Sequence, residues 1–262
     1  MTRVRDFEDA DAEAVAAIAA QCDETGPVSG GDAGYLRHVA ARGRVVVADG
    51  ETGVLGYGGA IRRDGTSFLT DLFVAPPARD HGVGGLLLAA LWDGSRDRAT
   101  SASQDPRALA SYARYGAVPR WPLLYLAVPG TSAEAPPPLE LGEHMPGEAG
   151  WHLRVEGLAT ARVRDPEGGP AVTAAVRRDG DSWVVARALT PDPSALVRLV
   201  AGLRPRVGPS GAVRLCVPGP HPALPDLLRA GARVSDVDLW CATAGASDLV
   251  DPTRELPSPG LS

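Results

Sequence analysis

The sequence contains no lysine and few cysteines or methionines. The 26 basic residues counted as lysine or arginine are all arginines. Cys22, Cys216 and Cys241 lie far apart, without the paired spacing of a zinc site or a disulfide framework, and the five histidines are equally scattered. The sequence therefore gives no indication of a metal site, and we expect no metal cofactor.

Two further absences limit the location and the partners. No apolar run is long enough to span a bilayer, and the first residues lack the apolar core of a signal peptide. The formal net charge of −6 argues against non-specific binding of nucleic acid, because phosphate binding requires a basic surface. We expect a cytoplasmic protein without a membrane or nucleic-acid partner.

The most informative stretch that is present runs from Phe68 to Trp92. An apolar, β-prone strand ends at Pro76, because proline has no N–H group to donate to a sheet. A glycine-rich turn follows and leads into an apolar helix that ends at Trp92. Glycines at the start of a helix let an anion approach the free N–H groups of the first turn. The stretch therefore predicts a cradle for phosphate groups.

The residues of the turn discriminate between families that bind phosphate in this way. A P-loop requires a lysine, and a dinucleotide fingerprint requires a third glycine where this chain has Leu87. The remaining pattern, Arg79-x-x-Gly82-x-Gly84, resembles the acetyl-CoA signature of the GNAT acyltransferase superfamily: Arg or Gln, two residues, Gly, any residue, then Gly or Ala. A chance glycine-rich turn is the alternative interpretation of these six residues.

The element order around the cradle strengthens the resemblance. A strand over 2–7, helices from Asp9 or Asp11 to Gln21 and over 33–41, and strands over 44–48 and 54–62 precede the cradle strand; a strand over 98–103 and a further helix follow the cradle helix. In that helix Asp105, Ala108, Tyr112 and Gly116 keep the family's register, with Asp105 replacing Asn and Ala117 replacing Phe. The resemblance implies an α/β fold of the α+β type, with a mixed, mostly antiparallel sheet flanked by helices.

The second half of the chain repeats part of the first. The stretch 61–68 recurs 115 residues later as 176–183, but the cradle glycines are missing after Pro191, and Leu227 stands in place of Tyr112. We therefore expect a tandem pair: a catalytic domain over 1–130, a linker over 131–150, a degenerate non-catalytic unit over 151–250 and a flexible tail over 251–262.

The resemblance also implies which residues bind the cofactor. The strand backbone at 72–74 would bind the pantetheine arm, with a backbone N–H near Val74 holding the oxyanion, and the helix mouth would bind the pyrophosphate, with Arg79 adding charge and His81 touching a phosphate. The implied cofactor-binding residues are Leu72, Phe73, Val74, Arg79, Asp80, His81, Gly82, Val83, Gly84, Gly85, Asp105 and Ala108. Asp105 is first an N-cap and only second a substrate contact.

Two residues are candidates for proton transfer. Tyr112 would protonate the departing thiolate as general acid; the alternative is a tyrosine that only packs on the sheet. Asp71 is the candidate base, because an acid within an apolar strand is unusual. Strand alternation places Asp71 on the face opposite Thr70 and Leu72, and it could equally cap a loop or hold an arginine.

The resemblance thus implies an acyl-CoA-dependent N-acyltransferase, an enzyme that transfers acetyl from its cosubstrate acetyl-CoA to a primary amine by direct attack in a ternary complex. The acceptor would be a small-molecule amine or an amino terminus, and the chain a monomer or homodimer. A non-catalytic CoA-binding sensor or scaffold is the alternative. The sequence leaves the acceptor and the acyl length open.

Overall fold

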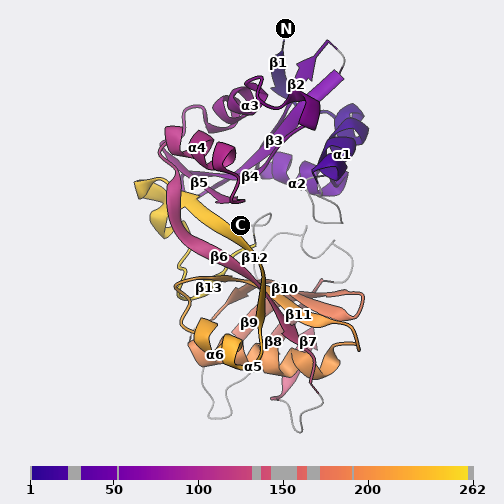
Figure 1. Cartoon of the computed structure of the whole chain (residues 1–262), viewed down its shortest axis with the longest axis vertical. Coiled ribbons are helices and arrows are strands. Elements are labelled where there is room, and N and C mark those ends of the chain that lie inside the picture. Colours follow the sequence, from indigo (N-terminus) through magenta and orange to yellow (C-terminus); the bar gives the residue numbers. More distant parts are fainter. Residues whose placement is uncertain are drawn as a thin grey trace. The chain divides into compact units, whose positions relative to one another are not determined.

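A computed structural model describes the chain except for residues 1, 23–30, 52, 132–136, 143–157, 164–171, 191 and 259–262. The chain forms two compact units (Figure 1). The first contains the described residues between 2 and 120 and residues 240–249, and the second contains the described residues between 121 and 239 and residues 250–258.

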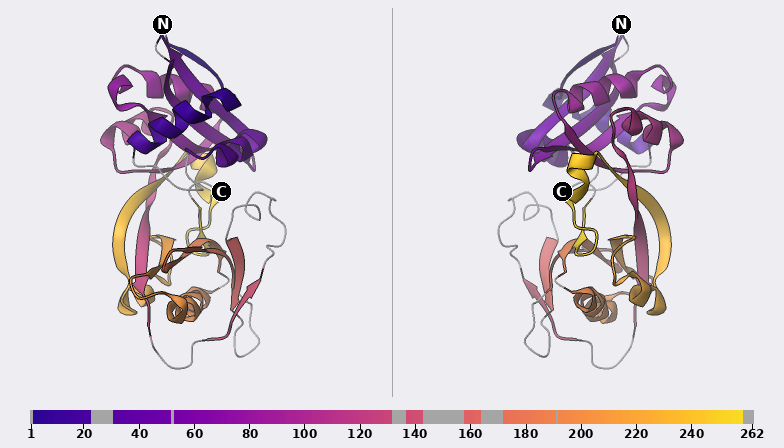
Figure 2. Two further views of the ribbon diagram at one scale, coloured as in Figure 1. Left: turned by 90° about the vertical axis from the view of Figure 1, so that its right-hand side faces the viewer. Right: turned by 90° about the vertical axis from the view of Figure 1, so that its left-hand side faces the viewer.

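The first unit is a mixed sheet with helices on both faces (Figure 2). Its strands, in spatial order, are β1 (Arg3–Asp6), β2 (Gly43–Gly50), β3 (Gly53–Arg63), β4 (Thr66–Val74) and β5 (Asp97–Ala102). Only the β4–β5 pair among them is parallel. The helices are α1 (Ala12–Gln21), α2 (Ala33–Arg42), α3 (Val83–Trp92) and α4 (Pro106–Arg114).

Glycines in β3 allow the helices to pack closely on the sheet. A Cβ atom at Gly58 would lie 2.8 Å from Leu91 of α3, and one at Gly59 would lie 3.0 Å from Val39 of α2. Because consecutive strand residues point to opposite faces, α3 and α2 cover opposite faces of the sheet. Side chains at these two positions would push the helices away and weaken the core.

The second unit is also a mostly antiparallel sheet, packed against helices. Its strands, in spatial order, are β12 (Arg233–Ala242), β6 (Val118–Pro129), β11 (Ala212–Pro218), β10 (Ser182–Leu189), β9 (Val172–Asp179), β8 (Leu158–Val163) and β7 (Leu139–Gly142), and β13 (Glu255–Leu256) pairs with β10. The apolar face of α5 (Pro193–Leu203), together with Leu227 of α6 (Leu224–Arg229), packs on one side of this sheet. The predicted fold class is confirmed.

The units divide the chain differently from the predicted domains 1–130 and 151–250. Residues 121–129 belong to the second unit and residues 240–249 to the first. Trp240 stacks on Phe68 with ring centroids 5.4 Å apart, which anchors the end of β12 in the core of the first unit. Local sequence patterns contain no information about such an exchange, because the contacting residues lie far apart in the chain.

Residues 251–258 also differ from the predicted flexible tail over 251–262, whose last four residues lie outside the described ones. Residues 250–258 pack in the second unit, where Val250 and Leu256 are fully buried. The proline content of this segment suggested a loose chain. Val250 and Leu256 are nevertheless buried, and Leu256 belongs to the core of the second unit, which holds the segment there.

A buried histidine joins the C-terminal segment to the rest of the second unit. The backbone N–H of Ala223 donates to Nδ1 of His221 (3.2 Å), so the proton of the neutral ring lies on Nε2. Nε2 then donates to the Thr190 hydroxyl (3.1 Å), which in turn donates to the carbonyl of Arg254 (2.9 Å). Burial lowers the pKa of His221 to about 4, although the nearby Asp251 carboxylate opposes the shift.

We therefore expect the stability of the second unit to depend on pH through His221. The folded state keeps this ring neutral below its usual pKa of 6.5, whereas the unfolded chain binds the proton there. Stability should fall as the pH is lowered from about 6.5 to about 4, by up to about 3 kcal/mol. Denaturant titrations across this range would measure the loss, and His221→Asn should flatten the profile. An equally steep profile in that variant would contradict the assignment.

Candidate functional site

The start of α3 is open, as the predicted cradle requires. Gly82 precedes the helix with φ +79°, and Asp80 also has a positive φ of 64°, so the turn depends on left-handed conformations that favour glycine. A Cβ atom at Gly82 or Gly85 would have no atom within 4 Å, and one at Gly84 would meet only Val74, at 3.6 Å. Val83 is buried and anchors the helix start. Among the described residues, the space on the side-chain side of these glycines is open, which favours approach of an anion to the first-turn N–H groups.

The end of β4 beside this helix is not paired with β5. β4 and β5 pair in parallel from Thr66↔Asp97 to Leu69↔Thr100, whereas β4 continues to Val74. The N–H of Ala75 donates to Leu55 of the preceding strand β3. Because backbone hydrogen-bonding groups alternate along a strand, those of Phe73 also point toward β3. Those of Leu72 and Val74 point to the other edge of β4, where β5 is no longer paired. The pairing of β4 with β5 therefore ends five residues before β4 itself ends at Val74.

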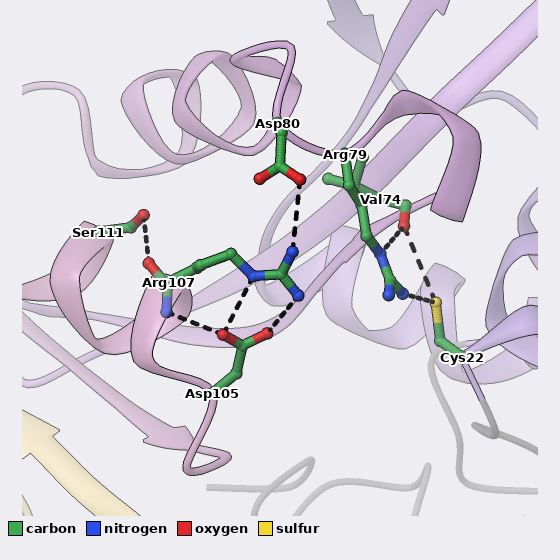
Figure 3. A network of polar contacts seen from close by, with 7 residues as sticks. All are labelled: Cys22, Val74, Arg79, Asp80, Asp105, Arg107 and Ser111. Carbon is green, nitrogen blue, oxygen red and sulfur yellow. Dashed lines mark hydrogen bonds and ion pairs between the residues drawn. The ribbon is translucent and has the colours of Figure 1, made fainter.

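Arg79 lies at the end of β4 rather than across the helix mouth (Figure 3). Its Nε donates to the carbonyl of Val74 (3.1 Å), and its Nη2 lies 3.2 Å from the sulfur of Cys22. His81 is exposed, and its Nδ1 lies 2.6 Å from the carbonyl oxygen of Arg79. Arg79 thus contacts the strand edge that β5 leaves, and its contribution to phosphate binding stays a prediction.

Arg107 is a cation near the cradle that the sequence analysis did not single out. Asp105 caps α4 by accepting from the backbone N–H of Arg107 (2.8 Å), and the Arg107 guanidinium contacts both Asp105 (3.1 Å) and Asp80 (3.5 Å). This side-chain contact holds the pKa of Asp105 below its usual range. Figure 3 shows Arg107 reaching from α4 toward the cradle turn. Ala108 follows in the first turn of α4. The sequence feature that could have identified Arg107 is its position two residues after Asp105, the N-cap of α4.

Asp71 and Thr70 point to the same face of the sheet, which corrects the prediction from alternation. The β3–β4 register shifts between Gly59 and Ala60, so a β-bulge interrupts the alternation at Thr70. A Cβ atom at Gly59 would lie 2.9 Å from the Thr70 hydroxyl and 3.4 Å from an Asp71 carboxylate oxygen. Both polar side chains therefore lie on the face that α2 covers.

Tyr35 of α2 holds the Asp71 carboxylate. Its hydroxyl donates to Asp71 over 3.0 Å, and both residues are buried. Burial and the nearby carboxylate raise the pKa of Tyr35 well above its usual range, so the hydroxyl stays protonated and remains a donor. The backbone N–H of Tyr35 is in turn bound by the N-cap Asp32 (2.7 Å), which fixes the first turn of α2. The role of Asp71 as base stays a prediction.

Tyr112 lies in α4 and is almost completely buried. Its ring meets the edge of Trp92 with centroids 5.8 Å apart, and its carbonyl accepts the N–H groups of Tyr115 and Ala117 where the helix ends. Gly116 supplies the positive φ (80°) of this helix end. The packing expected of a helix tyrosine is thus present. The proposed role as general acid depends on the hydroxyl and stays a prediction.

The described residues include no group of three or more histidine, cysteine, aspartate or glutamate side chains placed to hold a metal ion. In the same described part of the chain, no helix is long and apolar enough to cross a membrane.

The family model described as "Acetyltransferase (GNAT) domain" matches residues 41–116. No curated protein matched the sequence. Among solved structures, an acetyltransferase candidate from Pyrococcus horikoshii has a TM-score of 0.74 at 11% identity and covers 99% of this chain and 93% of its own. A tandem GNAT protein from the clavulanic acid biosynthesis pathway, solved without AcCoA, has a TM-score of 0.62 at 16% identity and covers 93% of this chain and 98% of its own. A GCN5-related N-acetyltransferase from Sphaerobacter thermophilus has a TM-score of 0.60 at 16% identity and covers 92% of this chain and 95% of its own.

Proposed function

Residues 41–116 belong to the GNAT superfamily of acetyltransferases, and on that basis we propose that this chain transfers an acetyl group from acetyl-CoA to a primary amine. The acceptor is a small molecule or a free amino terminus, and the amine attacks directly in a ternary complex. The observation that carries the proposal is the open mouth of α3 beside the end of β4 that is not paired with β5. One part fits a pyrophosphate, and the other fits an amide-bearing arm.

The first unit supplies a group for each requirement of this reaction. The N–H groups of the first turn of α3 bind phosphate, and the edge at Leu72 and Val74 orients the pantetheine arm. The Val74 N–H holds the oxyanion that develops at the acetyl carbonyl, a contribution of about 2.7–4 kcal/mol where such donors have been removed. Asp71 takes the proton of the incoming amine, directly or through water, and Tyr112 gives one to the departing thiolate.

The second unit is proposed to be a non-catalytic partner of the first. Where α3 begins with the open Gly82, α5 begins with Asp192, whose carboxylate already accepts the N–H of Ala195 (2.8 Å). A second anion at that position would be repelled. Leu227, fully buried, takes the place of Tyr112 and cannot donate a proton.

The proposal is tested by thiol release from acetyl-CoA in the presence of a panel of primary amines and peptides with free amino termini. We expect amine-dependent release by the full chain. Binding of acetyl-CoA without release with any amine would contradict an enzyme and favour the alternative, a CoA-binding sensor or scaffold. Absence of both binding and release would contradict the cofactor assignment itself.

Tyr35 is expected to position Asp71 for proton transfer. Tyr35→Phe keeps the buried ring and removes the hydroxyl that donates to the carboxylate. We expect kcat to fall by about tenfold, which corresponds to about 1.4 kcal/mol and to the loss of one hydrogen bond to a charged group. The KM for acetyl-CoA should stay unchanged, because neither residue belongs to the cradle.

A double-mutant cycle separates positioning from general stability. In the Asp71→Asn background, Tyr35→Phe should cost nothing further in kcat, because its only proposed effect passes through the carboxylate. Tyr125→Phe is the matched control: it removes a similar hydroxyl–carboxylate bond, to Asp238 (2.8 Å), in the second unit, and kcat should not change. Additive effects of Tyr35→Phe and Asp71→Asn would contradict the positioning role.

A further inference from the structure

β10 of the second unit repeats the geometry of β4. Each strand pairs antiparallel with the strand before it, through a register shift, and in parallel with the strand after it. The parallel pairing of β10 with β11 ends at Val185↔Leu215, although β10 continues to Leu189. The second unit therefore has the same opening between strands that the first unit offers to the pantetheine arm.

In the second unit this opening is occupied by the chain itself. β13 pairs antiparallel with β10 through Ala188↔Leu256 and Leu189↔Glu255. Because β9 pairs with the same two residues of β10, β13 must lie on the opposite edge, the one that β11 leaves. The N–H of Thr190 continues the pairing by donating to the carbonyl of Arg254 (2.7 Å).

The side chains hold this segment as firmly as the backbone does. Leu256 is 1% exposed and belongs to the hydrophobic core of the second unit. The Thr190 hydroxyl adds a second hydrogen bond to the carbonyl of Arg254, and His221 supports that hydroxyl from behind. At the adjoining helix start, the Asp192 carboxylate takes the place of a bound anion by accepting from Ala195 and from the Ser194 hydroxyl (2.5 Å).

We infer that residues 251–258 are a built-in ligand of the second unit: a segment whose strand, Glu255–Leu256, together with the Arg254 carbonyl, occupies the strand edge corresponding to the acyl-CoA arm site of the first. The comparison of the two edges rests on the proposed function. An extended backbone suits such an edge because its amide groups complete the hydrogen bonds of the sheet. The second unit keeps the strand edge of its fold, but its own residues 254–256 fill the hydrogen-bonding groups there. The full chain therefore binds one CoA.

The test uses the full chain and the variant Leu256→Asp, which places a charge in the core beneath the segment. We expect hydrogen exchange of the Thr190 amide to accelerate by at least about tenfold, because its acceptor on Arg254 is released. Leu228→Asp is the matched control, since Leu228 is 42% exposed on α6 of the same unit, and Thr190 protection should persist. A folded Leu256→Asp variant with unchanged protection would overturn the inference.

Two additions identify the occupant and cover a variant that does not fold. A synthetic peptide of residues 251–262 should restore Thr190 protection in Leu256→Asp, whereas restoration by pantetheine and not by the peptide would overturn the peptide assignment. Should Leu256→Asp fail to fold, Thr190→Val removes the hydroxyl that bonds Arg254 and His221 but keeps the backbone pairing, and it should accelerate exchange of the amide at position 190 about threefold or more; unchanged exchange would overturn the inference.

Calorimetry separates this inference from the proposed function. The wild-type chain should bind one equivalent of CoA, and Leu256→Asp should bind one equivalent with its affinity changed less than twofold. Two equivalents in the wild type would overturn the built-in ligand. No binding at all would overturn the proposed function, and the exchange of Thr190 would still decide the occupancy of the second unit.

Discussion

Gly84→Glu is expected to abolish the binding of acetyl-CoA while leaving the fold intact. A Cβ atom at this position meets only Val74, at 3.6 Å, which is an ordinary contact, so the side chain can be built without moving the backbone. Glutamate is also a better helix residue than glycine, by roughly 0.5–1 kcal/mol, and an acid in the first turn complements the helix dipole. Stability should therefore stay the same or rise.

Binding should respond in the opposite direction. The carboxylate would occupy the space from which phosphate approaches the first-turn N–H groups, and it would repel phosphate charge that these groups attract. We expect the affinity for CoA to fall at least about 100-fold, equivalent to about 2.7 kcal/mol. Calorimetry measures the change. Gly84→Gln has nearly the same shape without the charge and should lose less, whereas unchanged affinity in folded Gly84→Glu would remove the cradle assignment.

The parts of the first unit that the sequence predicted are those fixed by neighbouring residues. Pro76 ends β4, Gly82 takes the left-handed conformation before α3, and Asp105 caps α4, each through contacts within a few residues. The strand, turn and helix of the cradle followed from these local rules. The mixed, mostly antiparallel sheet flanked by helices followed in turn from the order of such elements.

The parts that the sequence could not predict depend on pairing between distant residues. The bulge that turns Thr70 and Asp71 to the same face depends on the register with Gly59, and alternation along β4 contains no trace of it. The contact between Tyr35 and Asp71 joins residues on different elements in the same way. Contacts between distant residues form only when the sheet assembles. Local sequence patterns therefore identified Asp71 as a candidate but could not identify the residues that contact it.

The C-terminal segment shows a second limit of sequence interpretation. Prolines and the position at the chain end predicted a loose tail, yet Leu256 pairs with Ala188 and is buried. The C-terminal segment is ordered by the edge of β10 beyond Val185. That edge can be recognised only when it is known that the parallel pairing with β11 stops at Val185. A two-residue strand has too short a pattern to predict its own partner.

Tyr112→Phe is expected to lower kcat by roughly 10²–10⁴-fold if general acid catalysis is fully used. The substitution keeps the ring and its edge contact with Trp92, at 5.8 Å between centroids, and the helix end formed by the Tyr112 carbonyl is a backbone feature that it does not touch. Stability should therefore change little, provided that the hydroxyl does not itself hold buried structure. Affinity for acetyl-CoA should hold too, because the hydroxyl meets the sulfur chiefly as charge develops there.

The size and place of the loss decide between the two roles of this tyrosine. Steady-state kinetics should put the loss on kcat, and calorimetry should show unchanged cofactor affinity. CoA thiolate is a fair leaving group, so a water molecule that replaces the hydroxyl would shrink the effect. Tyr115→Phe is the matched control, since Tyr115 also packs against Trp92, at 5.5 Å, one turn further along. A decrease below about tenfold, or one confined to KM, would assign Tyr112 to packing and leave the departing thiolate to solvent.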